Sequence, residues 1–181
     1  MCFHVRDALA KGSWIIQVFT VDTDVVVILI GVCGELLTMF PTAQIWVSFG
    51  MGDNFQQIHI NTVCSNLGDF KARALPGFHA FSGCDTTSQF YDKAEKLAWE
   101  AWKSYPEVTA AFNYMKEQPF KAIEQDLPTF KLLERFTCVL YGKTSNLESI
   151  NEQRQDLFSS KSMALMNIPP TEVSNKLISG I

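Results

Sequence analysis

The chain has 181 residues, 47% of them hydrophobic and 12% aromatic, which is enough apolar sequence for one domain with a buried core and excludes a largely disordered protein. Its formal net charge of −4 lacks the global basic signature of a protein that coats nucleic acid, although an enzyme can present a locally basic face. The five cysteines form no C-x-x-C pair, which argues against a structural zinc site and favours buried, reduced thiols in an intracellular protein of the nucleus or cytoplasm.

No segment is predicted to target the chain to a membrane. Residues 2–10 include His4, Arg6 and Asp7 in place of the apolar core of a signal peptide. The longest apolar run, Val25 to Val32, is too short to span a bilayer. We therefore expect a soluble protein with no membrane partner.

The first forty residues are expected to form a helix, a strand and a second helix. Apolar residues at helical spacing predict a helix over 1–11 with Gly12 as its candidate C-cap, and residues 14–21 are predicted to form a strand. The run 25–37 is ambiguous because its valines and isoleucines favour a strand. A helix packed on the sheet is favoured instead, since Thr23 and Asp24 form a good N-cap and no turn glycine is present to join two strands.

A hairpin comes next, and the remainder is expected to be helical. Two strands, over 45–49 and 55–60, are predicted around the loop 50–54, and Asn61 or Thr62 is expected to cap a short helix that ends at Gly68. Pro76-Gly77 is expected to start, bend or break a helix over 70–81. Further helices are predicted over 92–105, 108–116 and 130–140, and residues 145–162 are predicted to form a surface loop or a peripheral helix.

Three aspartates border apolar segments and are the candidate functional residues. Asp22 and Asp24 follow the first predicted strand, so they should emerge at its carboxyl end, where ligands gather in open α/β sheets. Asp85 lies in the turn Ser82–Thr87. Such carboxylates could bind a divalent metal. Alternatively, Asp22 or Asp24 caps the next helix while the other is exposed, and Asp85 is an N-cap.

Other polar and aromatic residues have plainer interpretations. His79 is interpreted as a hydrogen-bonded core histidine, and His59 as an outward residue of a strand. Trp99 and Trp102 are expected in the core rather than on a base-stacking surface. Lys93 and Lys96, with a third lysine on the same predicted helix, could contact phosphates or form a solvated face, since acidic residues alternate with them.

Several segments resemble one family of proteins. They are residues 20–27 (TVDTDVVV), 77–87 (GFHAFSGCDTT), 98–103 (AWEAWK) with 106–109 (PEVT), and 140–147 (LYGKTSNL). Together they resemble animal proteins related to mobile elements, whose core is similar to a PIN-like, flap-endonuclease-type nuclease domain. The resemblance covers nearly the whole chain.

The resemblance implies a fold and a chemistry. It implies an α/β, Rossmann-like three-layer PIN-like domain over 1–141, incomplete at its start, with a helical extension over 91–141 and a polar, peripheral or partly disordered segment over 142–181. It also implies hydrolysis of phosphodiester bonds in DNA or RNA, with Mg²⁺ or Mn²⁺ held by Asp22, Asp24 and Asp85. Lys93 and Lys96 are then candidates for contact with nucleic acid.

The sequence departs from this family's pattern in ways that favour an alternative. Residues 91–96 contain no glycine where the nucleases carry a phosphate-gripping glycine motif. A glutamate-bearing acidic motif and an earlier aspartate-bearing strand are expected upstream of Met1, and relatives continue beyond residue 171, so the chain is expected to be a fragment. The alternative is a catalytically inactive PIN-like fold that serves as an interaction module.

Overall fold

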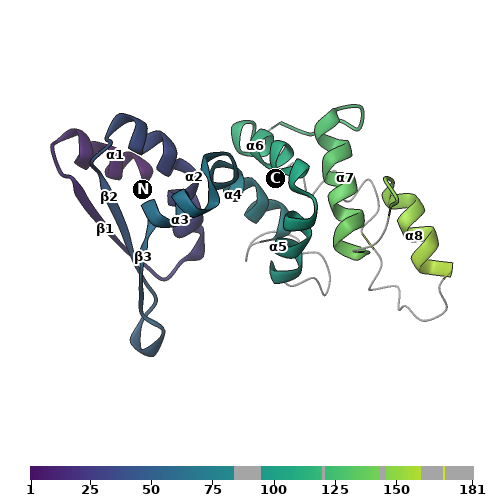
Figure 1. Cartoon of the computed structure of the whole chain (residues 1–181), viewed down its shortest axis with the longest axis horizontal. Coiled ribbons are helices and arrows are strands. Elements are labelled where there is room, and N and C mark those ends of the chain that lie inside the picture. Colours follow the sequence, from purple (N-terminus) through teal and green to yellow (C-terminus); the bar gives the residue numbers. More distant parts are fainter. Residues whose placement is uncertain (84–94, 120, 143–145, 160–168, 170–181) are drawn as a thin grey trace. The chain divides into compact units, whose positions relative to one another are not determined.

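The computed structural model describes residues 1–83, 95–119, 121–142, 146–159 and 169. The chain divides into two compact units, Met1–Pro76 and Gly77–Ile181 (Figure 1). The fold is mixed α/β, mostly helical with a small three-stranded sheet. The predicted α/β class is confirmed to this extent. The predicted division, with a domain over 1–141 and a polar segment over 142–181, stays a prediction.

The sheet of the first unit is mixed. Its strands are β1 (Ile15–Thr20), β2 (Gln44–Phe49) and β3 (Gln56–His59), in the order β1-β2-β3. β1 and β2 are parallel, whereas β2 and β3 form the predicted antiparallel hairpin, which projects from the rest of the unit in Figure 1. The hairpin loop contains the 3-10 turn η1 (Gly52–Asn54). Gly50 begins this loop with φ of 83°, and a Cβ there would lie 2.5 Å from the Asn54 carbonyl oxygen, so glycine is required.

The connection from β1 to β2 is α2 (Thr23–Met39), so the ambiguous valine-rich run is helical, as expected. Burial decides against strand propensity here, because Leu29, Cys33 and Leu36 lie at helical spacing in the core. The same core takes in residues from α1 (Cys2–Ala10) and α3 (Ile60–Leu67). Alternate residues of β1 and β2 point toward this core. The side chains of Ile15, Gln17 and Phe19 of β1 therefore lie on the opposite face of the sheet.

Two details at the helix ends differ from the predictions. α3 begins at Ile60 with His59 at the N-cap and no side-chain cap. Asn61 instead receives a hydrogen bond from the Ile45 amide (2.9 Å) and donates one to the Ala43 carbonyl (2.8 Å), which ties α3 to the start of β2. In α1 the C-cap is Lys11, and Gly12 follows it with φ of 94°. Of the apolar residues whose helical spacing predicted α1, Phe3 is 85% exposed and lies outside the core.

Pro76 lies inside α4 (Asp69–Ser82), which is a continuous helix. The proline therefore neither starts nor ends the helix, although it removes one backbone hydrogen bond. It packs closely on α2, because a Cβ at Gly31 would lie 2.4 Å from the Pro76 Cγ. Gly31 thus gives the first part of α4 room to approach α2.

The second unit is helical. Besides the end of α4 it contains α5 (Glu95–Ser104), the 3-10 turn η2 (Pro106–Val108), α6 (Thr109–Glu117), α7 (Pro128–Tyr141) and α8 (Ile150–Ser159). Its core is aromatic: the ring of Phe78 stacks on that of Trp102 at 4.6 Å, and Phe112 lies edge-on to both. The Trp102 indole N–H donates to the Thr109 hydroxyl (2.8 Å), so this tryptophan is in the core, as predicted.

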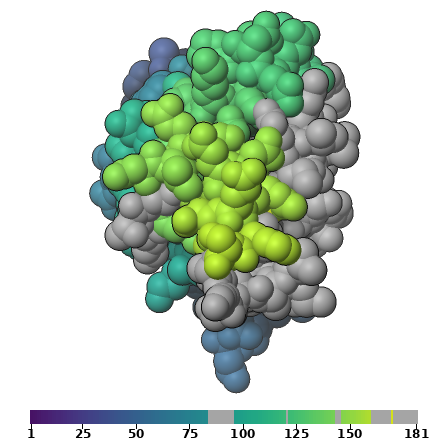
Figure 2. Space-filling view, turned by 90° about the vertical axis from the view of Figure 1, so that its right-hand side faces the viewer, coloured from purple at the N-terminus to yellow at the C-terminus, as the bar shows by residue number. Residues whose placement is uncertain are grey.

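The last described helix belongs to the surface of the second unit. Figure 2 shows α8 in yellow-green on the face turned to the viewer. It packs on α7 and buries Ile150 and Gln153. Of the two alternatives predicted for residues 145–162, a helix therefore forms over Ile150–Ser159.

Candidate functional site

The first two candidate aspartates lie in the turn from β1 into α2. The Asp22 amide donates to the Thr20 hydroxyl oxygen (3.0 Å), and the Asp24 amide donates to Asp22 Oδ1 (2.9 Å). Asp22 is therefore the N-cap of α2, and Asp24 lies in its first turn. Asp22 is exposed and Asp24 is half-buried. The capping alternative is thus confirmed for Asp22.

Both aspartates lie at the carboxyl edge of the parallel strand pair. Thr20 is in register with Phe49, and the Gly50 amide donates to the Thr20 carbonyl oxygen (3.0 Å), so β1 and β2 end side by side. The hairpin loop leaves from this same edge and carries Asp53, which is exposed. From the sequence, residues 50–54 were interpreted only as a hairpin loop. Because β1 and β2 are parallel, the loop that follows β2 begins at the same edge as the turn that follows β1, and this places Asp53 there.

The other candidate residues are dispersed or undescribed. Asp85 and Lys93 lie outside the described residues, so the structure brings together Asp22 and Asp24 alone. Within residues 1–83 and the described parts of the second unit, no group of three or more His, Cys, Asp or Glu side chains is arranged to hold a metal ion.

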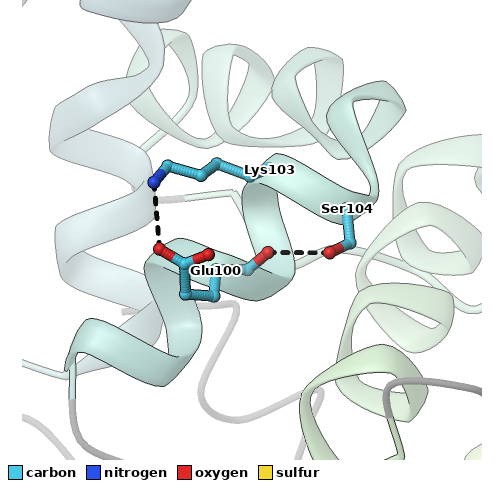
Figure 3. Close-up of polar contacts among 3 residues, drawn as sticks. All are labelled: Glu100, Lys103 and Ser104. Atoms are coloured by element: carbon cyan, nitrogen blue, oxygen red, sulfur yellow. Dashed lines mark hydrogen bonds and ion pairs between the residues drawn. The ribbon is translucent and has the colours of Figure 1, made fainter.

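Lys96 is exposed near the start of α5. Farther along this helix, Lys103 forms an ion pair with Glu100 (2.9 Å), and the Ser104 hydroxyl donates to the Glu100 carbonyl (2.9 Å), as Figure 3 shows. Both side chains of the pair are exposed to solvent, so this end of α5 is a solvated face with internal charge pairing. Contact of Lys96 with phosphate stays a prediction.

The imidazole of His59 joins β2, β3 and α3. Its ring stacks on Trp46 with the ring centres 4.2 Å apart, and its nitrogens lie 2.7 Å from the Thr62 hydroxyl and 2.8 Å from the Gln44 amide oxygen. His59 was predicted to point outward from its strand, but it is half-buried and held by these contacts. His79 is half-buried in α4, less enclosed than the predicted core histidine.

The described cysteines are free thiols, and burial suppresses their ionisation. Burial, with the neighbouring Cys64 thiol and Asp69, raises the pKa of Cys33 to about 12. Burial, together with Glu134, raises the pKa of Cys138 to about 11. Neutral, enclosed thiols are poor nucleophiles and poor metal ligands, so these two residues are structural. The prediction of buried thiols is confirmed for Cys33, Cys64 and Cys138, whereas Cys2 is only half-buried and Cys84 lies outside the described residues.

A pocket of about 780 Å³ lies in the second unit between α7, α8 and the segment before α8. Glu134 on its wall accepts a hydrogen bond from the Ile150 amide (2.9 Å), and the Arg135 guanidinium donates to the Leu147 carbonyl. Tyr105 also lines it, and burial raises the pKa of its hydroxyl. Sequence reasoning missed this pocket because it depends on how α8 docks on α7, which no local pattern specifies.

Known proteins offer no further guide to the site. In comparisons with protein-family models, curated proteins and solved structures, no match to the chain was found. Among the described helices, none has the length and apolar character needed to cross a membrane.

Proposed function

We propose that the chain is a divalent-metal-dependent, nuclease-like domain of PIN-like type that acts on phosphodiester bonds of DNA or RNA. Asp22, Asp24 and Asp85 are the proposed metal-binding and catalytic residues. The observation that supports this proposal is the position of Asp22 and Asp24 at the carboxyl end of β1, where β1 runs parallel to β2. This edge is where α/β sheets of the Rossmann type bind their ligands.

The two described carboxylates have the right donor chemistry for Mg²⁺ or Mn²⁺. These hard cations prefer oxygen ligands, and Mg²⁺ is commonly bound by one or two carboxylates together with substrate phosphates. The capping bond occupies one acceptor position on Asp22 Oδ1, whereas an ionised carboxylate offers about four such positions. Capping and metal binding by Asp22 are therefore compatible.

The residues around the aspartates would fix the geometry of such a site. Thr20 holds the Asp22 amide, and Asp22 holds the Asp24 amide, so the turn is ordered by its own side chains. The pairing of Gly50 with Thr20 anchors the adjacent hairpin. A bound divalent ion would supply activation of water and stabilisation of the leaving oxygen. Lys93 and Lys96 are the proposed contacts to nucleic-acid phosphates.

The direct test is cleavage of single-stranded and branched DNA and RNA by the full chain with Mg²⁺ or Mn²⁺. The informative variant is Asp22→Asn, because asparagine caps a helix about as well as aspartate but carries no negative charge. We expect metal-dependent cleavage by the natural sequence and its loss in Asp22→Asn, with little change in thermal unfolding. Absence of metal-dependent cleavage by the natural sequence, or equal cleavage by Asp22→Asn, would contradict the proposal.

A second candidate function is that of an inactive PIN-like fold acting as an interaction module. Two observations favour it: Asp22 already has a structural role as an N-cap, and β1 exposes large apolar side chains, among them Phe19 at 74% exposure. This candidate predicts no metal-dependent cleavage. It also predicts that Asp22→Asn with Asp24→Asn raises the unfolding temperature by relieving charge repulsion, whereas loss of metal-induced stabilisation in this double variant would favour the nuclease.

A further inference from the structure

β1 is an edge strand with an outward-facing row of backbone groups. In the described sheet it pairs with β2 alone. At its two ends, the carbonyl oxygens of Trp14 and Thr20 accept hydrogen bonds from the Gln44 and Gly50 amides. Because backbone groups alternate in direction along a strand, the even-numbered residues face β2. The N–H and C=O groups of Ile15, Gln17 and Phe19 therefore face the open edge.

The sequence of this edge lacks the charges and prolines that often protect exposed strands. Residues 14–21 include no charged residue, no proline and no glycine. Along them, Trp14 is 63% exposed, Ile15 53%, Phe19 74% and Val21 63%. Natural edge strands are normally blunted by charges, prolines, bulges or covering segments, because an uninterrupted apolar edge pairs readily with another strand. The composition of β1 therefore fits a strand that is paired in the working protein.

We propose that β1 pairs with β1 of a second copy of this chain, antiparallel, about a two-fold axis at Gln17. A two-fold arrangement closes on itself and uses the same edge of both copies, so it gives a dimer rather than a filament. In this register Gln17 lies opposite the partner's Gln17, and Ile15 lies opposite the partner's Phe19. All the outward backbone groups of Ile15, Gln17 and Phe19 then fall in hydrogen-bonded pairs.

Side chains on both faces of the joined sheet would meet suitable neighbours. On the open face, Ile15 and Phe19 make a β-branched–aromatic pair across the ladder, a favourable cross-strand combination. On the helix-covered face, the half-buried Ile16 and the partner's Val18 lie opposite each other and extend the existing core. Gln17 keeps its side chain directed to β2, where its amide donates to the Ser48 hydroxyl (2.7 Å).

The apolar area exposed along the edge sets the size of such an interface. Aromatic side chains present about 150–250 Å² each, so the exposed fractions of Trp14, Phe19 and their two aliphatic neighbours amount to roughly 500 Å² per copy. Pairing at the edge covers part of this area, so two copies would together bury at most about 1,000 Å², the size of a small interface. The ladder of backbone hydrogen bonds and the cross-strand side-chain pairs would hold this interface together. This inference does not depend on metal binding or nuclease activity.

The oligomeric state of the full chain tests the proposal. By sedimentation equilibrium at micromolar concentrations we expect a dimer. Phe19→Lys should raise the dissociation constant of the dimer roughly tenfold or more, because the lysines would lie beside apolar partners at a pairing edge. The matched control is Phe158→Lys on α8, since Phe158 is 70% exposed and far from β1 in sequence. Its dimer should persist.

Three results would overturn the proposal: a monomeric natural chain, open-ended higher assemblies, or equal weakening by Phe19→Lys and Phe158→Lys. Circular dichroism should show both variants folded, because substitutions of such exposed side chains are usually tolerated. A folded monomer for Phe19→Lys alone supports pairing through β1.

Cysteine cross-linking tests the register. In a background with Cys2→Ser and Cys84→Ser, Gln17→Cys should form an intermolecular disulfide, because residues of a hydrogen-bonded pair have Cα atoms about 5.5 Å apart. Phe19→Cys is the matched control and should not cross-link to itself, since it lies opposite Ile15. A dimer in which Phe19→Cys cross-links and Gln17→Cys does not would refute the Gln17-centred pairing.

Discussion

The two compact units achieve stability with different kinds of core. In the first unit the largest fully buried side chains are aliphatic (Leu29, Ile45 and Ile60), and they join a sheet to helices. In the second unit they are mostly rings, with Trp102 and Phe112 at the centre. Asp22, Asp24 and the open strand edge belong to the first unit. The comparison teaches that the positions of Asp22 and Asp24 depend on the sheet, while the aromatic helices form a separately packed core.

The largest expected effect is the loss of an aromatic ring from the second core. Trp102→Ala removes a fully buried side chain, its stack on Phe78 and its hydrogen bond to Thr109, so we expect it to lower the unfolding free energy by about 3–5 kcal/mol. Phe158→Ala is the control, since Phe158 is 70% exposed on α8, and should change the unfolding free energy by less than about 0.5 kcal/mol. Urea denaturation measures both.

Native-state hydrogen exchange extends this test to the independence of the two units. Amides of α2 should keep their protection in Trp102→Ala, while those of α6 and α7 lose it. Simultaneous loss of protection in α2 would show that the two cores unfold as one, contrary to the comparison.

A smaller effect is expected where α2 meets α4. Gly31→Ala would place a Cβ 2.4 Å from the rigid ring of Pro76, so we expect a net loss of about 1–3 kcal/mol in unfolding free energy. The matched control is Gly34→Ala, whose Cβ would meet the exposed carboxylate of Asp69 instead, a group that can move away. Gly34→Ala should be neutral or stabilising through its better helix propensity. A larger loss in Gly34→Ala would contradict this packing.

Removal of the N-cap of α2 should have a still smaller effect. Asp22→Ala deletes the acceptor of the Asp24 amide and should cost about 1 kcal/mol of unfolding free energy, by thermal or urea denaturation. Asp22→Asn should cost much less, because the amide oxygen can replace the carboxylate oxygen as acceptor. Equal destabilisation by alanine and asparagine would show that charge, not capping, is what stabilises this turn.

The smallest effect is expected from thiol ionisation just above pH 9. The pKa of Cys33 is raised to about 12 and that of Cys138 to about 11 in the folded protein, against 9.0 without these environments. The unfolded state therefore loses these protons first, so the stability that the neutral thiols contribute is intact below pH 9 and declines as the pH rises toward 11. Urea midpoints measured across this range should fall, and less steeply in Cys33→Ala.

Much of the first unit could be predicted from its sequence because local signals agreed with one another. The absence of a turn glycine after Asp22 and Asp24 correctly favoured a helix over a strand for the valine-rich run. The loop from Gly50 to Asn54 correctly indicated a hairpin. Asp22 was anticipated as an alternative cap from residue type alone.

Features that depend on contacts between distant segments could not be predicted in this way. Asn61 was expected to cap α3, but its side chain is used by the backbone near Ile45. Pro76 was expected to start, bend or break its helix; α4 neither starts nor ends there, and Pro76 packs closely against Gly31 of α2. The pocket beside α7 likewise arises only when α8 docks. In each case the deciding neighbour is remote in sequence.

The measurement that tests the central claim most directly is calorimetric titration of Mn²⁺ into the full chain and into Asp22→Asn. If Asp22 and Asp24 bind the metal, the natural chain should give a saturable binding heat, and Asp22→Asn should weaken the affinity roughly tenfold or more, because it removes a charged oxygen ligand but retains the cap. No binding heat, or equal affinity in both proteins, would contradict a metal site at the carboxyl end of β1.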